Sequence, residues 1–118
     1  MESRGLIQDE GPALDYEAAL QAIHSLVGRR VEVTVMSRKP LGVVAEFAGE
    51  LTRGHNVRPA SRAAEGEAFR FAVGAENSFS VEARIFHEAG WVLAGTPEGS
   101  LRLYLGAAVV QIDPADPP

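Results

Sequence analysis

The sequence predicts a small, mainly antiparallel β-barrel preceded by one α-helix. Hydrophobic residues recur at helical spacing once, near the N-terminus, between Asp15 and Gly28. After Gly28, apolar and polar residues alternate, which is typical of strands with one buried face. Turns that contain glycine or proline separate these short segments, and a chain of 118 residues is long enough for a single core.

The predicted helix has a defined start and end. Asp15 is expected to cap its N-terminus, and Gly28 suits the left-handed residue beyond its C-terminus. One stripe of the helix is apolar and is expected to pack on the barrel. This stripe consists of Tyr16, Leu20, Ile23 and Val27.

The first strands follow from alternation. Residues 31–35 form the first, and a basic turn at residues 37–40 leads to a longer strand at residues 42–51. Val43 and Leu51 are expected on the same face of this longer strand. Gly49 within it predicts a sharp bend or the close approach of another backbone segment. Further strands are expected at residues 69–73, 79–85 and 91–94, with residues 87–90 breaking the chain before the last.

Residues 100–112 are expected to close the barrel. The apolar residues of its first half are the leucines at 101, 103 and 105, whereas from Ala108 the apolar positions are even-numbered. Such a change of phase would turn a core face outward unless the chain bends. Gly106 can adopt the positive φ that a tight corner needs, so we predict two strands joined at Gly106 that face one core.

The chain is predicted to divide into a flexible arm at residues 1–12, one helix-plus-barrel domain at residues 13–112 and a flexible tail at residues 113–118. The tail, DPADPP, is expected not to continue a sheet because of its prolines. The absence of cysteine excludes disulfides and thiolate metal sites. No apolar run is long enough for a membrane span, and no signal peptide precedes the helix, so we expect a cytoplasmic protein without membrane contact.

No catalytic or metal-binding pattern stands out. His24, His55 and His87 are far apart in the sequence and show no ligand spacing. Glu46 and Glu50 can be interpreted as a carboxylate pair on a bent strand, but exposed strand positions are ordinarily charged, and we favour that interpretation. We therefore predict that the protein is not an enzyme and has no cofactor and no metal.

Three stretches resemble the Sm-like proteins. The segment LVGRRVEV at residues 26–33, behind a helix, resembles the opening Leu-x-Gly-x-x-Val-x-Val strand of that family. Residues 42–51 are similar to its bent, glycine-containing second strand, and residues 103–112 to its second motif, two apolar strands hinged at an Arg/Lys-Gly pair. The resemblance implies a strongly bent Sm-like or SH3-like barrel, rings formed by strand addition, and RNA binding through the hinge and the loop after the second strand.

The sequence also departs from the family. Leu105 stands where the hinge has a cation, and the loop after the second strand has an Asn but no Asp in the expected place. The segments at 69–73, 79–85 and 91–94 are more than the family needs, so an additional hairpin is expected. A related SH3-like barrel without RNA binding accommodates all of these differences.

The loop after the second strand is the strongest functional candidate in the sequence. Its candidate residues are Arg53, His55, Asn56, Arg58 and Arg62, in a protein with a net charge of −5. Guanidinium groups bind phosphates and carboxylates in a bidentate fashion, so the loop can hold RNA, an anionic ligand or an acidic protein segment. The resemblance adds Gly106 to these candidates. The alternative is a solvated loop, partly neutralised by its own glutamates.

We expect a non-enzymatic binding or assembly module, with a protein-interaction scaffold as the first hypothesis and a single-stranded RNA-binding ring as the alternative. The net charge and Leu105 favour the scaffold. The strand after Gly106 carries Val109, Val110 and Ile112 without lysine or proline, as an unprotected edge would. We therefore predict a homo-oligomer through edge strands, with a closed ring favoured if the resemblance holds.

Overall fold

The computed structural model describes residues 13–57, 68–92 and 99–115. Within these residues one helix, α2 (Tyr16–His24), precedes the strands. The strands are β1 (Arg30–Arg38), β2 (Leu41–Glu50), β3 (His55–Val57), β4 (Ala68–Val73), β5 (Asn77–Glu82), β6 (Phe86–Val92), β7 (Ser100–Leu105) and β8 (Ala108–Pro114). A 3-10 helix, η1 (Ala83–Ile85), connects β5 to β6. None of the helices described has the length and apolar composition that crossing a membrane requires.

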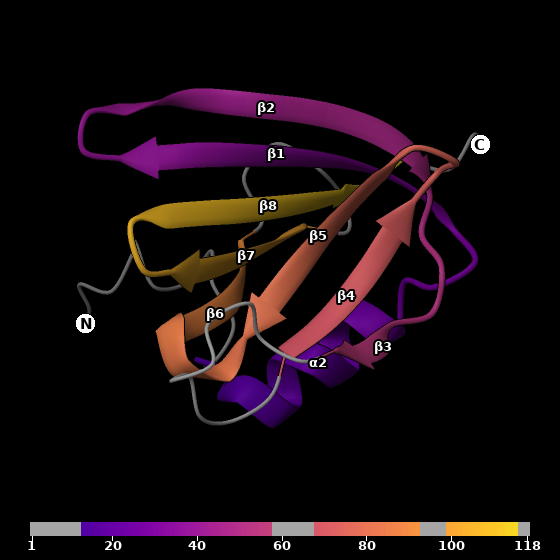
Figure 1. Cartoon of the computed structure of the whole chain (residues 1–118), viewed down its shortest axis with the longest axis horizontal. Helices are drawn as coiled ribbons and strands as arrows, with labels where there is room; N and C mark the ends of the chain where they lie inside the picture. The colour runs from indigo at the N-terminus through magenta and orange to yellow at the C-terminus, as the bar shows by residue number, and fades with distance from the viewer. Residues whose placement is uncertain (1–12, 58–67, 93–98, 116–118) are drawn as a thin grey trace.

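The strands form two antiparallel sheets. The larger sheet has the order β2-β1-β8-β7-β6, and the smaller has the order β3-β4-β5. In Figure 1, β4 and β5 cross in front of the larger sheet and α2 lies below them. The chain is therefore mainly β with one N-terminal helix, as predicted, but the strand ladders of the described residues do not close into one barrel.

Two connections join the sheets. An isolated bridge pairs Leu51, just after β2, with Val73 of β4. Beside it, the Thr52 amide donates to the Ala72 carbonyl and the Gly74 amide to the Glu50 carbonyl, each at 2.9 Å. On the other side, β5 runs through η1 directly into β6, so one stretch of chain leaves the smaller sheet and enters the larger.

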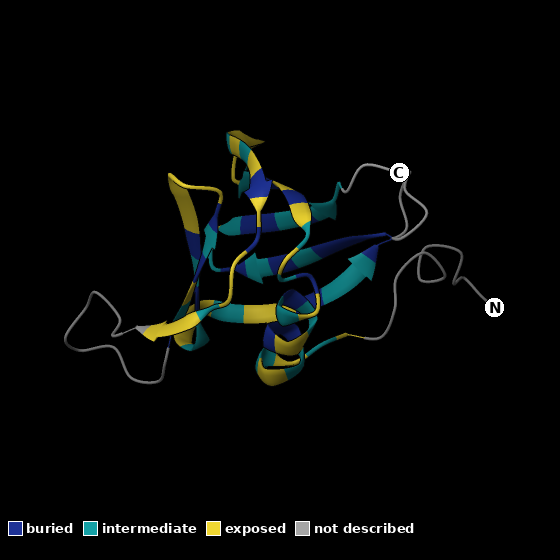
Figure 2. Cartoon of the chain, turned by 90° about the vertical axis from the view of Figure 1, so that its right-hand side faces the viewer, coloured by how far each residue is buried: buried dark blue, intermediate teal, exposed yellow. Residues whose placement is uncertain are grey.

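The core lies between the two sheets and α2. Figure 2 shows the buried segments gathered in the middle of the molecule, with exposed residues at the turns and outer strands. Burial of a large aliphatic or aromatic side chain contributes roughly 1.5–3 kcal/mol. The largest fully buried side chains come from all three layers: Ile23, Val31, Val33, Leu51, Phe71, Val73, Val81, Leu101, Leu103 and Ile112.

The predicted N-cap of the helix is confirmed, but the helix ends earlier than predicted. It stops at His24 with Ser25 as its C-cap, so Gly28 follows a further turn and Val27 of the predicted stripe lies outside the helix. The Asp15 carboxylate accepts a hydrogen bond of 2.8 Å from the Ala18 amide, and Gly28 has a φ of +91°. Leu20 and Ile23 are buried. The Gly28 amide also donates to the Leu51 carbonyl at 2.7 Å, so the helix exit is tied to the point where the sheets meet.

The change of phase around Gly106 is also confirmed. Gly106 has a φ of +60°, and the two-residue turn pairs Leu105 with Ala108. Leu103 and Val110 are opposite each other, and both are buried. The predicted free edge on this strand, however, is wrong: β8 pairs with β1 on one side and with β7 on the other.

Gly49 confirms the expectation of a close backbone approach. A Cβ atom at this position would lie 2.7 Å from both Cα and N of Gly74. The expected common face of Val43 and Leu51 is wrong. A bulge shifts the register so that Val35 pairs with Ala45 but Met36 with Val43, which moves Val43 to the face opposite the core, where it is 60% exposed.

Two boundaries also differ from the prediction. The expected strand at residues 79–85 stops at Glu82, because the chain turns through η1 to change sheets. The expected break at residues 87–90 lies inside β6, where Ala89 is buried opposite Leu103, so cross-strand pairing overrides weak strand propensity. Residues 93 and 94 of the strand expected at 91–94 lie outside the described residues.

The tail was expected to leave the sheet at Asp113, but β8 continues through Pro114. The Ala115 amide donates to the Arg30 carbonyl at 2.9 Å. Because successive N–H groups of a strand point to opposite sides, the N–H that Pro114 lacks would point toward β7 and not toward β1. Pairing with β7 has already ended there, at Leu101 and Ile112. The arm at residues 1–12 and the end of the tail, residues 116–118, lie outside the described residues.

Candidate functional site

The predicted arginine loop is described only in its first part. Arg53 is exposed beyond the end of β2. His55 and Asn56 are exposed residues of the short strand β3, where the sequence predicted an irregular loop, and His55 pairs with Arg70 of β4. Arg70 is therefore a further cation beside these residues.

Arg58 and Arg62, the other two arginines of the loop, lie outside the described residues. The structure thus places Arg53, His55 and Asn56 on consecutive parts of one segment, at the end of the molecule where β2 stops. A site formed by all three arginines remains a prediction.

Gly106 does not join this loop. The Arg38 amide bonds the carbonyl of Ala107, so Gly106 lies where β1 and β2 turn, whereas Arg53 follows the opposite end, where Arg30 pairs with Glu50. Figure 1 shows the β7–β8 turn at the left of the larger sheet and β3 at the lower right. A nine-residue strand such as β1 separates these ends by roughly 26 Å, so no site can contain both Arg53 and Gly106.

A different set of residues gathers on the face of the larger sheet that points away from the core, called here the outer face. Cross-strand pairing aligns one row across all of its strands. This row consists of Val43, Met36, Val109, Tyr104 and Glu88. The next row, toward the β3 end, places Thr34, Gln111 and Arg102 side by side.

A shallow hollow of about 400 Å³ lies on this face. We call it the Tyr104 hollow; it is lined by Met36, Arg38, Leu41, Arg102, Tyr104 and Val109. Four of the six lining side chains are apolar or aromatic, and two are guanidinium groups. The hollow therefore combines apolar contact with positive charge.

Two contacts hold Arg38 at the wall of the hollow. Its guanidinium carbon lies 5.6 Å from the centre of the Tyr104 ring, within cation–π distance. Its Nη1 atom donates to the Gly106 carbonyl at 3.3 Å. A second hollow of about 390 Å³ adjoins through Arg38 and is lined also by Lys39, Gly106 and Ala107. The cations beside Gly106 are thus Arg38 and Lys39 of the β1–β2 hairpin.

Arg102 is held by a chain of polar side chains along the outer face. Its Nε atom donates to Gln111 Oε1 at 2.7 Å, and Gln111 Nε2 donates to the Asp113 carboxylate at 3.2 Å. The hydroxyl of Ser100 donates to the same carboxylate. These bonds fix the orientation of the Arg102 guanidinium before any ligand arrives.

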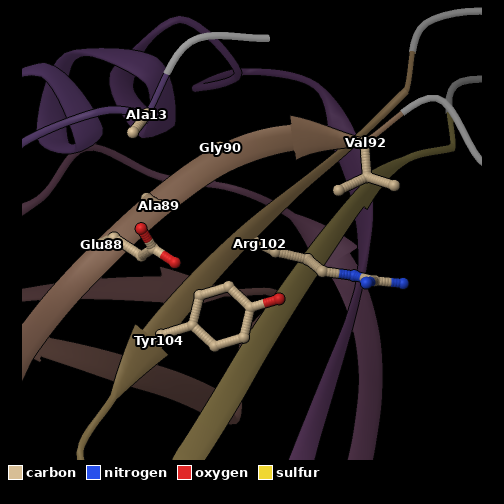
Figure 3. A pocket seen from close by; sticks show the side chains of 7 residues that line it. All are labelled: Ala13, Glu88, Ala89, Gly90, Val92, Arg102 and Tyr104. Atoms are coloured by element: carbon tan, nitrogen blue, oxygen red, sulfur yellow. The ribbon is translucent and has the colours of Figure 1, made fainter. Parts of the chain in front are cut away.

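A small cavity lies on the other side of Tyr104, between β6 and β7. Figure 3 shows Tyr104 and Arg102 projecting from the same side of β7, with Glu88 of β6 beside the tyrosine ring. The cavity has a volume of about 70 Å³. Because a cavity that admits benzene measures about 150 Å³, this space is too small to hold a ligand of that size.

Acidic residues surround the cationic part of the outer face. Glu88 pairs with Tyr104, Glu46 with Thr34 and Glu32 with Asp113. Glu46 and Glu50 are both exposed but four residues apart on one strand, roughly 13 Å, so they do not form a carboxylate pair. Within the part of the chain that the structure describes, no three His, Asp or Glu side chains are grouped as metal ligands.

Comparisons of this chain with protein-family models, with curated proteins and with solved structures found no match. Its candidate site therefore rests on the geometry described above.

The sequence pattern contains a partial signal for the Tyr104 hollow. Alternation with the buried leucines places Arg102 and Tyr104 on one outward face of their strand, and the basic turn contains Arg38. The sequence does not show that β8 pairs with both β1 and β7. This pairing brings Arg38 close to Tyr104, although the two residues are 66 positions apart in the sequence. No local pattern indicates which distant strand will be the neighbour.

Proposed function

We propose that this protein is a non-enzymatic binding module that holds an acidic, partly apolar segment of a partner protein in the Tyr104 hollow. The observation that carries the proposal is the position of Arg38 over the Tyr104 ring, at the wall of a hollow whose other lining residues, apart from Arg102, are apolar or aromatic. The Arg38 side chain is already held by stacking on Tyr104 and by a hydrogen bond to a backbone carbonyl, so it loses little conformational entropy when it binds a carboxylate. This pre-organisation favours recognition at the site.

The chemistry of the lining defines the ligand. Met36, Leu41 and Val109 offer apolar contact, and the flexible thioether of Met36 adapts to different side chains. Arg38 and Arg102 line the same hollow and contribute its two positive charges. A segment with one aliphatic or aromatic side chain next to one Asp or Glu satisfies both requirements.

Single-stranded RNA is the second candidate. An aromatic ring flanked by cations is a stacking platform for bases, which favours RNA at Tyr104. A phosphate backbone, however, needs several cations in a line. The outer face instead surrounds Arg38, Lys39 and Arg102 with the carboxylates described above, and the chain has a net charge of −5. These charges support a protein ligand over RNA.

We also propose that the two sheets are the halves of one small barrel of SH3-like or Sm-like type. The support comes from the two connections between them: the bridge between Leu51 and Val73, and the passage from β5 through η1 into β6. Together they give the cyclic order β1-β2-β4-β5/β6-β7-β8-β1. We retain the expectation of a cytoplasmic protein, since the sequence contains no cysteine.

Fluorescence anisotropy with two labelled probes tests the proposed function. One probe is a pool of short peptides that contain a Glu between Leu, Phe or Trp, and the other is a mixed pool of short oligoribonucleotides. We expect the peptide pool to bind and Tyr104→Ala to weaken that binding at least tenfold. Arg53→Gln is the matched control, because Arg53 is exposed at the opposite end of the sheet, and it should leave binding unchanged.

Binding of RNA but not peptide, reduced by Arg53→Gln and unaffected by Tyr104→Ala, would contradict the proposal. Binding of RNA that depends on Tyr104 would select the second candidate at the same face. Steep weakening by added salt would accompany RNA binding, because counterions are released from the phosphates.

A further inference from the structure

The described part of the chain begins beside the candidate site. Leu14 is bridged to Ala89 of β6, and its amide donates to the Ala89 carbonyl at 2.8 Å, so this segment lies along β6 on the side opposite β7. Ala13 lines the small cavity of Figure 3 together with Arg102 and Tyr104, which also line the Tyr104 hollow. The residues before Ala13 are therefore attached to the protein next to this hollow.

The sequence just before Ala13 matches the chemistry of the hollow. Residues 6–10, LIQDE, contain an aliphatic pair that is followed by an acidic pair. Gly11 and Pro12 come between the acidic pair and Ala13, and a Gly-Pro dipeptide is typical of a turn. The sequence thus predicts that the chain leaves the edge of β6 at this point, with an acidic and partly apolar stretch beyond the turn.

We propose that residues 6–10, called here the LIQDE segment, bind in the Tyr104 hollow of the same chain and compete there with the partner segment. This inference rests on the proposed function, in which the lining of the hollow defines the ligand as an aliphatic side chain next to a carboxylate. The LIQDE segment is a ligand of this class that is tethered beside its site. A partner then binds only when it displaces the segment.

The acidic pair is within reach of the nearer guanidinium group. The antiparallel bridge to β6 places Ala13 in line with Gly90, which pairs with Arg102 of β7. Two strand spacings therefore separate Ala13 from Arg102, or roughly 10 Å. The three residues from Glu10 to Ala13 span up to about 10 Å. The carboxylates of the segment can thus meet the guanidinium group that Gln111 holds in place.

The aliphatic pair has a longer tether and a longer distance to cover. Val109 and Met36 lie roughly 16 and 20 Å from Ala13, counted in strand spacings and in residues along the sheet. Ile7 and Leu6 can reach about 20 and 23 Å from Ala13 in extended chain. The aliphatic side chains therefore reach the apolar part of the hollow. A segment in the reverse order would place its carboxylates against these apolar residues instead.

Tethering makes a weak contact effective. A short tether gives a segment an effective concentration on the order of 1 mM. A segment with its own dissociation constant of about 0.1 mM then occupies the hollow in about nine of ten molecules. The apparent affinity for a competing peptide falls about tenfold, because only the remaining molecules have an open hollow.

Fluorescence anisotropy with the acidic peptide pool tests the competition in the full chain. Leu6→Ser with Ile7→Ser removes the apolar contact, and Asp9→Asn with Glu10→Gln removes the charges. We expect each double variant to bind the pool about three- to tenfold more tightly than the wild type. Glu76→Gln is the matched control, because Glu76 is exposed in the turn between β4 and β5 of the other sheet, and it should leave the affinity unchanged.

A spin label tests the contact without any peptide. The chain contains no cysteine, so Ser3→Cys provides a single attachment site for a nitroxide. We expect this label to broaden the amide signals of Met36 and Val109 in the NMR spectrum of the full chain. Leu6→Ser with Ile7→Ser, introduced into the same labelled chain, should remove most of the broadening.

The two measurements distinguish the inference from the proposed function. Equal affinity of the wild type and both double variants for the peptide pool would overturn the inference. Broadening that stays the same when the aliphatic pair is replaced would overturn it as well. If no variant binds the peptide pool, the proposed function fails, whereas broadening that depends on the aliphatic pair still supports the contact between the LIQDE segment and the hollow.

Discussion

Gly49 of β2 and Gly74, which follows β4, approach so closely that a Cβ atom on Gly49 would lie 2.7 Å from Cα of Gly74. The contact lies where the two sheets meet, because the Gly74 amide also donates to the carbonyl of Glu50 at 2.9 Å. A side chain at position 49 would push against backbone, which cannot rotate away as a flexible side chain can.

Gly49→Ala should therefore destabilise the protein. We expect the free energy of unfolding to fall by about 1–3 kcal/mol, the usual cost of overpacking, measured by urea denaturation. Gly42→Ala is the matched control on the same strand, since a Cβ there meets no atom within 4 Å. Equal effects of the two substitutions would contradict the close approach of the sheets.

Several features of the fold could be predicted because their signals are local. A helix cap depends on Asp15 and the residues of one turn, and the corner at Gly106 is marked by a glycine at a single change of hydrophobic phase. Gly49 interrupts an alternating strand, which predicts a sharp bend or a close backbone approach without indicating the partner segment. Each of these inferences needed only neighbouring residues.

The features that were missed depend on distant segments. The bulge that turns Val43 outward arises in the pairing of β1 with β2, and the internal position of β8 depends on two partners at once. Arg38 and Tyr104 meet because β8 lies between their strands. The clustered charges around Arg53 predict a functional loop, and that stays a prediction. Its combination with Gly106 could not be judged from the sequence, because Gly106 lies at the other end of the sheet.

Leu103→Ala tests the packing of the closing hairpin. Leu103 is fully buried opposite Val110, so its truncation should lower the free energy of unfolding by about 2–5 kcal/mol. Arg102→Ala, the neighbour on the outer face, should cost only about 1 kcal/mol through the lost bond to Gln111. Chemical denaturation of both variants measures the difference. A reversed order of the two effects would mean that the strand faces the other way.

Arg38→Lys tests whether the planar guanidinium matters in the proposed site. The substitution keeps the positive charge but loses both the stacking on Tyr104 and the bidentate geometry that carboxylates favour. We expect affinity for the acidic peptide pool to fall about five- to tenfold, as measured by fluorescence anisotropy. Lys39→Arg keeps a cation at the neighbouring position and should have little effect. An Arg38→Lys variant with wild-type affinity would reduce the role of Arg38 to that of a positive charge.

The central claim is that ligands bind on the outer face of the larger sheet at Tyr104. The most direct measurement is a map of backbone amide chemical shifts, recorded by NMR while the acidic peptide pool is added to the wild-type protein. We predict that the largest changes fall on Met36, Arg38, Leu41, Tyr104 and Val109. Changes confined to Arg53, His55 and Asn56, with the sheet face unaffected, would contradict the claim.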